Sequence, residues 1–130
     1  MAQCGEFEIY KTASGNYNFR LKASNKTTIA VSGGAGYASL SSCKAALESI
    51  KKIATSKIED QTLKNYETLT NPKFEIYEDK AGKFRFRLKA KNGELICVSE
   101  DGYATKASCK LGCESVAKWS ANSEIVLNVD

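Results

Sequence analysis

Phe74-Glu75-Ile76-Tyr77 repeats Phe7-Glu8-Ile9-Tyr10, and Phe86-Arg87-Leu88-Lys89-Ala90 repeats Phe19-Arg20-Leu21-Lys22-Ala23 at the same spacing. Nearly half of the aligned positions of the two copies are identical, which chance does not give. The chain is therefore predicted to be a tandem duplication. Farther along, the two copies align again when Ala35 is left out of the alignment. The equivalent segments are Gly36-Tyr37-Ala38 and Gly102-Tyr103-Ala104, Cys43-Lys44 and Cys109-Lys110, and Glu48-Ser49 and Glu114-Ser115.

Each copy begins with a pattern typical of strands. Apolar and polar residues alternate along 7–10 and 17–22, which predicts two half-buried strands with one apolar face. Gly15-Asn16 separates them as a turn. In the second copy Asn92-Gly93 is a strong turn signal that leads into a third strand at 95–98.

An amphipathic helix follows the strands of each copy. Its apolar positions fall three and four residues apart, and Ser39 and Thr105 stand where an N-cap is expected. A short apolar stretch, around Ile58 and then at 125–129, closes each copy as β-β-β-α-β. The helix positions are Leu40, Cys43, Leu47, Ile50 and Ala54 in the first copy, and Cys109, Cys113, Val116 and Ser120 in the second.

The domain organisation predicted from the repeat is a first unit at 1–60, a linker at 61–72 and a second unit at 73–130. A linker of about a dozen residues can span up to roughly 40 Å, so the fourth strand of one unit can reach the sheet of the other. Leu63, Tyr66 and Leu69 predict that the linker packs down on the units.

Composition excludes several classes of function. With 130 residues, 42% of them hydrophobic, the chain is long enough to bury a core without metal or disulfides. It has no apolar run of membrane-spanning length and does not begin like a signal peptide, so we expect a cytoplasmic protein. Histidine is absent, which removes the commonest general base and metal ligand. Five cysteines without CxxC spacing predict free thiols packed as apolar groups; no cofactor and no metal site are expected.

These motifs resemble those of the YegP-like domain family. The resemblance rests on Phe-Glu-Ile-Tyr, on the run 84–94, and on the Gly-Tyr that precedes a helix ending in Glu-Ser-Val. The first unit departs from the pattern at Asn18 and at 24–27, and the linker is longer. The resemblance implies two β₃-α-β units that share one antiparallel sheet and exchange their final strands. It implies no reaction and no catalytic residues.

The fold class expected from these observations is α+β, with two tandem β(3)-α-β units forming one antiparallel sheet and two helices on one face. Because the duplication supplies both halves, we expect a monomer with internal pseudo-twofold symmetry. We expect no enzymatic activity, since nothing pairs the matched helix carboxylates Glu48 and Glu114 with a base or nucleophile. Glu48 and Glu114 have lysines three or four residues farther on, as in surface ion pairs.

The most informative candidate site is the strand face that points away from the helices. Five cations on it oppose two carboxylates, Glu8 and Glu75, and two tyrosines lie among them. Such a face can bind single-stranded nucleic acid or an acidic protein partner. It can equally be a solvated face whose charges pair across strands, in a purely structural or stress-related domain with no specific ligand. The candidate binding residues are Tyr10, Arg20, Lys22, Tyr77, Arg85, Arg87 and Lys89.

Weaker candidates accompany this face. Residues 33–36 form a glycine-rich loop before a helix, which is either an ordinary turn or an anion site. Tyr37 and Tyr103 either pack over the helix starts or line a groove between the units. Trp119 is expected in the core or at the seam between units, and Cys4 is the thiol most expected to be exposed.

Overall fold

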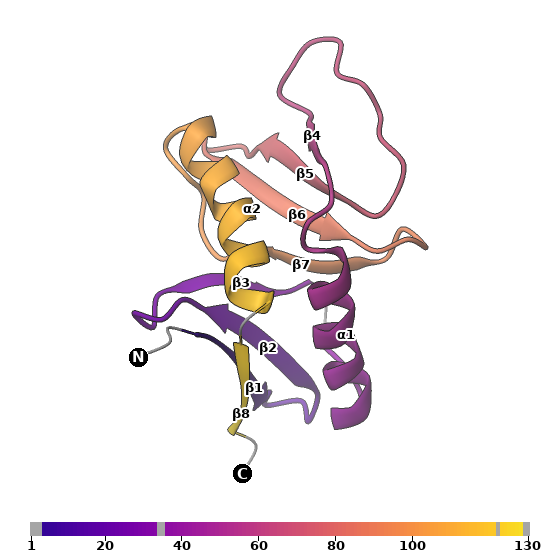
Figure 1. The fold of residues 1–130 in the computed structure, drawn as a ribbon, viewed down its shortest axis with the longest axis vertical. Helices are drawn as coiled ribbons and strands as arrows, with labels where there is room; N and C mark the ends of the chain where they lie inside the picture. Colours follow the sequence, from indigo (N-terminus) through magenta and orange to yellow (C-terminus); the bar gives the residue numbers. More distant parts are fainter. Residues whose placement is uncertain (1–3, 34–35, 122, 129–130) are drawn as a thin grey trace.

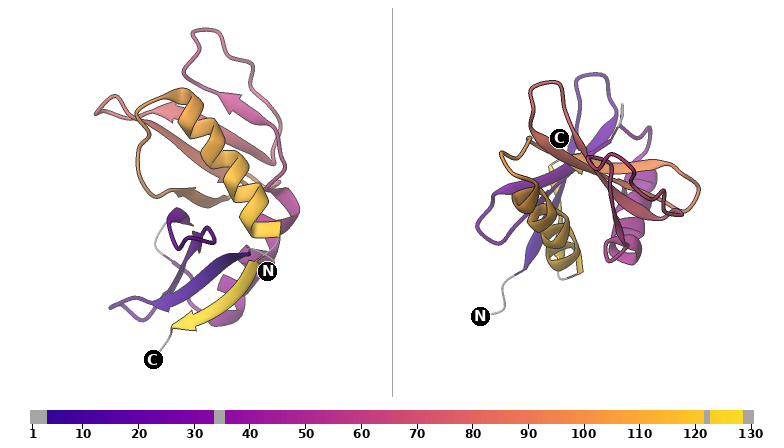
Figure 2. Two further views of the ribbon diagram at one scale, coloured as in Figure 1. Left: turned by 60° about the vertical axis from the view of Figure 1, so that its left-hand side comes forward. Right: turned by 90° about the horizontal axis from the view of Figure 1, so that it is seen from above.

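The computed structural model describes residues 4–33, 36–121 and 123–128. Within them, eight strands form one sheet and two helices lie on one of its faces (Figures 1 and 2). In chain order the elements are β1 (Gly5–Lys11), β2 (Tyr17–Lys22), β3 (Thr28–Ser32), α1 (Leu40–Ile53), β4 (Ile58–Asp60), β5 (Lys73–Glu78), β6 (Phe84–Lys89), β7 (Leu95–Ser99), α2 (Lys106–Ala121) and β8 (Ser123–Asn128).

The strand order is β4-β5-β6-β7-β3-β2-β1-β8, so each unit gives its last strand to the other. β4 pairs with β5 and β8 pairs with β1, as the family resemblance implies. Both pairs are parallel, and the prediction of an antiparallel sheet is therefore wrong at the two edges: the sheet is mixed. The reason is that no hairpin joins either exchanged strand to its sheet neighbour. β8 follows α2 and runs antiparallel to β7, which is itself antiparallel to β1, so β8 is parallel to β1; β4 follows α1 in the same way.

The two units meet in the middle of the sheet. β3 and β7 pair antiparallel, with Val31 opposite Val98. The two units therefore form one continuous sheet rather than two separate ones, and elements of the two repeats lie symmetrically about this seam (Figure 1).

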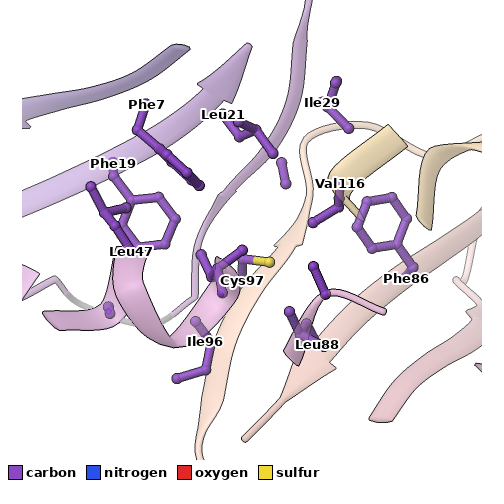
Figure 3. Packing of buried hydrophobic residues seen from close by; sticks show 14 of the residues in the cluster. Phe7, Phe19, Leu21, Ile29, Leu47, Phe86, Leu88, Ile96, Cys97 and Val116 are labelled. Atoms are coloured by element: carbon purple, nitrogen blue, oxygen red, sulfur yellow. The ribbon is translucent and has the colours of Figure 1, made fainter. Parts of the chain in front are cut away.

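One hydrophobic core lies between the sheet and the helices. Phe7 and Phe19 pack edge to face with ring centroids 6.1 Å apart, and Phe74 and Phe86 repeat the pair at 5.9 Å. Figure 3 shows Cys97 between the group around Phe19 and the group around Phe86. The core is thus shared by both units, and burial of each such side chain contributes about 1.5–3 kcal/mol.

Both predicted helix caps are confirmed. The Ser39 hydroxyl accepts a hydrogen bond from the backbone N–H of Ser42 at 3.1 Å, and the Thr105 hydroxyl accepts one from Ser108 at the same distance. Each bond satisfies a backbone donor that has no partner inside the helix. Neither helix is long and apolar enough to cross a membrane, within the residues that the structure describes.

The turn before the third strand differs between the units. Gly93 has a φ of +83°, in the left-handed region that glycine enters at no steric penalty. The equivalent residue of the first unit is Lys26, which adopts a φ of +71°. The backbone geometry of the turn is thus kept although its glycine is not.

The linker does not pack down as expected. Leu63 and Tyr66 are 52% and 41% exposed, and only Leu69 is half-buried. The loop is instead held by a polar contact, because the N–H of Leu69 donates to Glu59 Oε1 at 2.6 Å. This hydrogen bond anchors the loop to β4 without any contact between the exposed side chains and the core.

Candidate binding face

The face of the sheet opposite the helices, here called the outer face, carries the residues singled out as a binding surface. Along β1, β2, β5 and β6 the core residues alternate with them. The strand register aligns a row of six residues across this face: Glu8, Arg20, Val31, Val98, Arg87 and Glu75. The structure therefore brings the two arginines to equivalent places on either side of the central valine pair.

In the first unit Glu8 is the centre of the charge pairing. Its Oε1 lies 3.2 Å from Arg20 Nε and 2.9 Å from Lys22 Nζ. Hydrogen bonds from Lys22 and Asn128 hold the pKa of the Glu8 carboxyl below its usual value against a smaller, opposing effect of burial. The Arg20 guanidinium lies over the Tyr10 ring, 4.3 Å from its centroid. Asn18 accepts a hydrogen bond from Ser32 rather than facing a carboxylate.

The second unit repeats this arrangement with more contacts. Glu75 Oε1 lies 2.5 Å from Arg87 Nε and 3.5 Å from Lys89 Nζ. The Arg87 guanidinium lies 4.4 Å from the centroid of the Tyr77 ring. Arg85 pairs instead with Asp79, Nε to Oδ2 at 2.7 Å, and this bond lowers the pKa of the Asp79 carboxyl.

A buried charge cluster at the β4 edge was missed from the sequence. Lys73 Nζ lies 2.7 Å from Glu59 Oε1 and 3.2 Å from Glu75 Oε2, and all three residues are buried. Burial alone would raise the pKa of Glu59, but hydrogen bonds from Lys73, Gln61 and Leu69 outweigh it and leave that pKa lowered. The pKa of Lys73 is raised by its two carboxylate partners, although burial opposes them. A signal was present: Glu59 stands in the short apolar strand, and Lys73 replaces an acidic residue, Glu6.

The outer face is closer to charge balance than the sequence suggested. All five of the cations in the candidate set have a carboxylate within 4.0 Å. The surplus of positive charge was overcounted because Asp79, just beyond β5, pairs with Arg85 of this face. Glu59, on the exchanged strand β4, is paired with Lys73, and neither was in the count. Partners set by strand exchange cannot be read from alternation within one strand.

The two tyrosines before the helices have different surroundings. Tyr37 stacks on Phe19, centroids 6.4 Å apart, and also lines a cavity of about 350 Å³ with Glu94 and Ile96 of the other unit. Burial raises its pKa to about 12. Tyr103 stacks on Phe86 at 6.3 Å. Both tyrosines therefore pack against the core, and Tyr37 also lines a groove between the units.

The cysteines are free thiols in both units. Cys43, Cys97, Cys109 and Cys113 are buried, and Cys4 is half-buried. Burial raises the pKa of Cys43 and Cys109 to about 11 and that of Cys97 to about 12, so these thiols stay protonated at neutral pH. No group of three or more metal-ligating side chains occurs among the described residues.

The remaining candidates have ordinary surroundings or lie outside the described residues. Glu48 pairs with Lys51 at 3.8 Å, as a surface ion pair on α1. Trp119 packs against the core where β1 begins, and a Cβ on Gly5 would meet its backbone oxygen at 2.5 Å. The candidate anion loop at 33–36 includes residues 34 and 35, which the structure does not describe.

Comparison with known proteins finds the same repeat elsewhere. A family model described as a domain of unknown function (DUF1508) matches the chain twice, at residues 13–60 and 79–126. The UPF0339 protein YegP of Yersinia pestis is 39% identical over 114 residues, which cover 88% of this chain and 87% of that protein. A UPF0339 protein of Treponema denticola is 57% identical over 54 residues, 42% of this chain but 91% of that relative, which therefore has the size of one unit.

The fold also matches a solved structure. The solution NMR structure of yegP from E. coli, a protein of unknown function, superposes with a TM-score of 0.78 at 28% identity. The match covers 99% of this chain and 97% of that one. None of these proteins carries a described activity that would identify the role of the outer face.

Proposed function

Because the chain belongs to the YegP-like DUF1508 family, whose function is unknown, we propose from its own geometry that it is a small non-catalytic binding module. Its outer face is the binding surface, and single-stranded nucleic acid is the ligand. The observation that carries the proposal is the Arg–Tyr stack present in both units, Arg20 over Tyr10 and Arg87 over Tyr77, on the face that no helix covers.

The stacks supply two elements that binding a single strand requires. Each guanidinium lies over a ring and has a carboxylate near its Nε. Arg87 Nε donates a hydrogen bond to Glu75, whereas Arg20 Nε lies 3.2 Å from Glu8 Oε1 without a hydrogen bond. A guanidinium has five N–H donors, so its Nη nitrogens can still contact a phosphate, although one Nη of Arg87 also donates to Gln61. The planar guanidinium and the tyrosine below it offer a base a stacking surface that does not depend on sequence.

A second candidate function rests on a different observation. Since every cation in the candidate set already has a carboxylate partner, the outer face can serve stability alone, in a structural domain without a specific ligand. Cross-strand ion pairs of this exposure contribute about 0.2–1 kcal/mol each, which is enough to account for the alternation of charges.

The experiment that separates these functions is a titration of fluorescein-labelled single-stranded DNA and RNA at low and moderate salt. The test variant is Arg20→Ala/Arg87→Ala. The matched control is Lys44→Ala/Lys110→Ala, which removes the same charge from exposed positions on the two helices.

Binding that weakens with salt, survives in the lysine control and is reduced about tenfold or more in the arginine variant would support the nucleic-acid site. The slope of log K against log salt should also become shallower by about 0.7 for each phosphate that the variant no longer neutralises. Equal weakening in both variants would indicate unspecific attraction. If the wild-type protein does not bind at low salt, the nucleic-acid proposal is refuted, and an acidic protein partner and the structural role are the functions left to test.

A further inference from the structure

The edge strand β8 exposes three consecutive apolar side chains. Ile125, Val126 and Leu127 are 37%, 39% and 47% exposed, although the strand pairs with β1 along its length. No other strand lies on the far side of β8 in the part of the chain that the structure describes, and Figure 1 shows it at the lower end of the sheet. An unpaired apolar strand edge is a template for adding another strand.

The opposite edge of the sheet is protected. β4 has only three residues, Glu59 in its middle is charged, and the returning half of loop 61–72 lies beside it. Short strands and charged residues are how natural sheets prevent edge pairing. β8 of one copy therefore has no matching edge at β4 of another, and a head-to-tail fibre is disfavoured.

We propose that β8 pairs antiparallel with β8 of a second copy of this chain, about a twofold axis that passes beside Val126. A twofold axis perpendicular to the sheet keeps opposed residues on one face. In this register Val126 meets its own copy, Ile125 meets Leu127, and Glu124 meets Asn128 rather than an apolar residue or the other Glu124. The strand thus matches itself in polarity and brings no like charges together, as an isologous dimer requires.

The proposed dimer does not depend on ligand binding at the outer face. It also goes beyond the expectation of a monomer, which rested on the two units completing one another through β4 and β8. Strand exchange accounts for the edge of β8 that pairs with β1. It says nothing about the opposite edge of β8, which faces away from β1.

The test is sedimentation equilibrium from about 10 μM to about 1 mM, where weak interfaces of small area become populated. Two double variants carry the test: Ile125→Lys/Leu127→Lys and Ile125→Lys/Leu127→Glu. They remove the same apolar surface, but the first opposes like charges in the proposed register and the second opposes unlike charges. Leu63→Lys is the control for an exposed leucine elsewhere, and thermal melts check that each variant folds.

We expect the wild type and Leu63→Lys to dimerise equally. The Lys/Lys variant should associate about tenfold or more weakly than the Lys/Glu variant, because unlike charges directly opposite attract and like charges repel. Amide exchange within 123–128 should slow as the wild-type concentration rises. A wild type that stays monomeric throughout, or two double variants that associate equally, would overturn the proposal.

Discussion

Lys73→Met is the sharpest test of how the second unit is held together. The Lys73 side chain is 8% exposed and lies between Glu59, at 2.7 Å, and Glu75, at 3.2 Å. Removing the ammonium group leaves two buried carboxylates facing each other, and Arg87 and Lys89 contact only Glu75. Breaking a buried ion pair in this way destabilises a protein by about 3–5 kcal/mol, so we expect a decrease of that order in the free energy of unfolding.

The matched control is Lys26→Met. Lys26 Nζ lies 2.6 Å from Glu6 Oε1, almost the same distance as in the buried pair, but its side chain is 69% exposed. A surface ion pair contributes little, so this variant should unfold at nearly the urea concentration of the wild type. Both variants remove a lysine with a carboxylate oxygen within 2.7 Å, and Lys73 differs from Lys26 in its burial and in its second carboxylate partner, Glu75.

The effect of Lys73→Met should depend on pH in a definite direction. The wild-type carboxylates have lowered pKa values in the folded state, so their contribution is present at neutral pH and is lost as pH falls through those values. In the variant the lysine no longer opposes the effect of burial, so the pKa of Glu59 is higher than in the wild type and acid destabilises the folded variant less. The difference between wild type and variant should therefore be largest near neutral pH and shrink in acid.

Urea unfolding followed by circular dichroism at several pH values measures this difference. Equal destabilisation by Lys73→Met and Lys26→Met, or a difference that grows as pH falls, would refute the reasoning.

Three further predictions follow from the core and the helix ends. Gly112→Ala should destabilise the protein by about 1–3 kcal/mol in thermal melts, because a Cβ there would lie 2.5 Å from the Tyr103 hydroxyl; an unchanged or higher melting temperature would contradict this. Ser39→Ala and Thr105→Ala should each destabilise the protein by about 0.5–2 kcal/mol, because each removes the hydrogen bond that caps a helix. Ser39→Asp should keep the stability of the wild type and Ser39→Val should not, because only aspartate can accept the cap hydrogen bond. A thiol reagent should modify Cys4 in the native protein and the four buried cysteines, Cys43, Cys97, Cys109 and Cys113, only on unfolding. Fast reaction of more than one thiol in the native protein would contradict this.

The repeat and its alternation predicted most of the fold because they report which face of a strand is buried. Phe7, Phe19 and their copies stand in the core as their positions indicate. Alternation contains no information on strand direction, however, so the parallel pairing of β4 and β8 was not predicted from it. Strand exchange itself entered through a family resemblance and the length of the linker.

The candidate site was predicted in its positions but not in its pairing. The cations of the outer face lie where the period of two places them, and their partners depend on which strand lies next to them. Glu59 and Lys73 are 14 residues apart and meet only because β4 crosses to the second unit. Exposure of Leu63 and Tyr66 was likewise unpredictable, since the polar contact that anchors the loop comes from the same exchanged strand.

The pairing of β1 with β8 has a consequence for synthesis on the ribosome. β1 ends at Lys11, whereas β8 begins only at Ser123. During translation the first unit can form its hairpin and helix, but its edge at β1 stays open until β8 has emerged, because domains form as their segments become available. β8 thus closes the unit that begins at β1, and a nascent chain arrested before Ser123 would present the edge of β1 to chaperones and to other nascent chains.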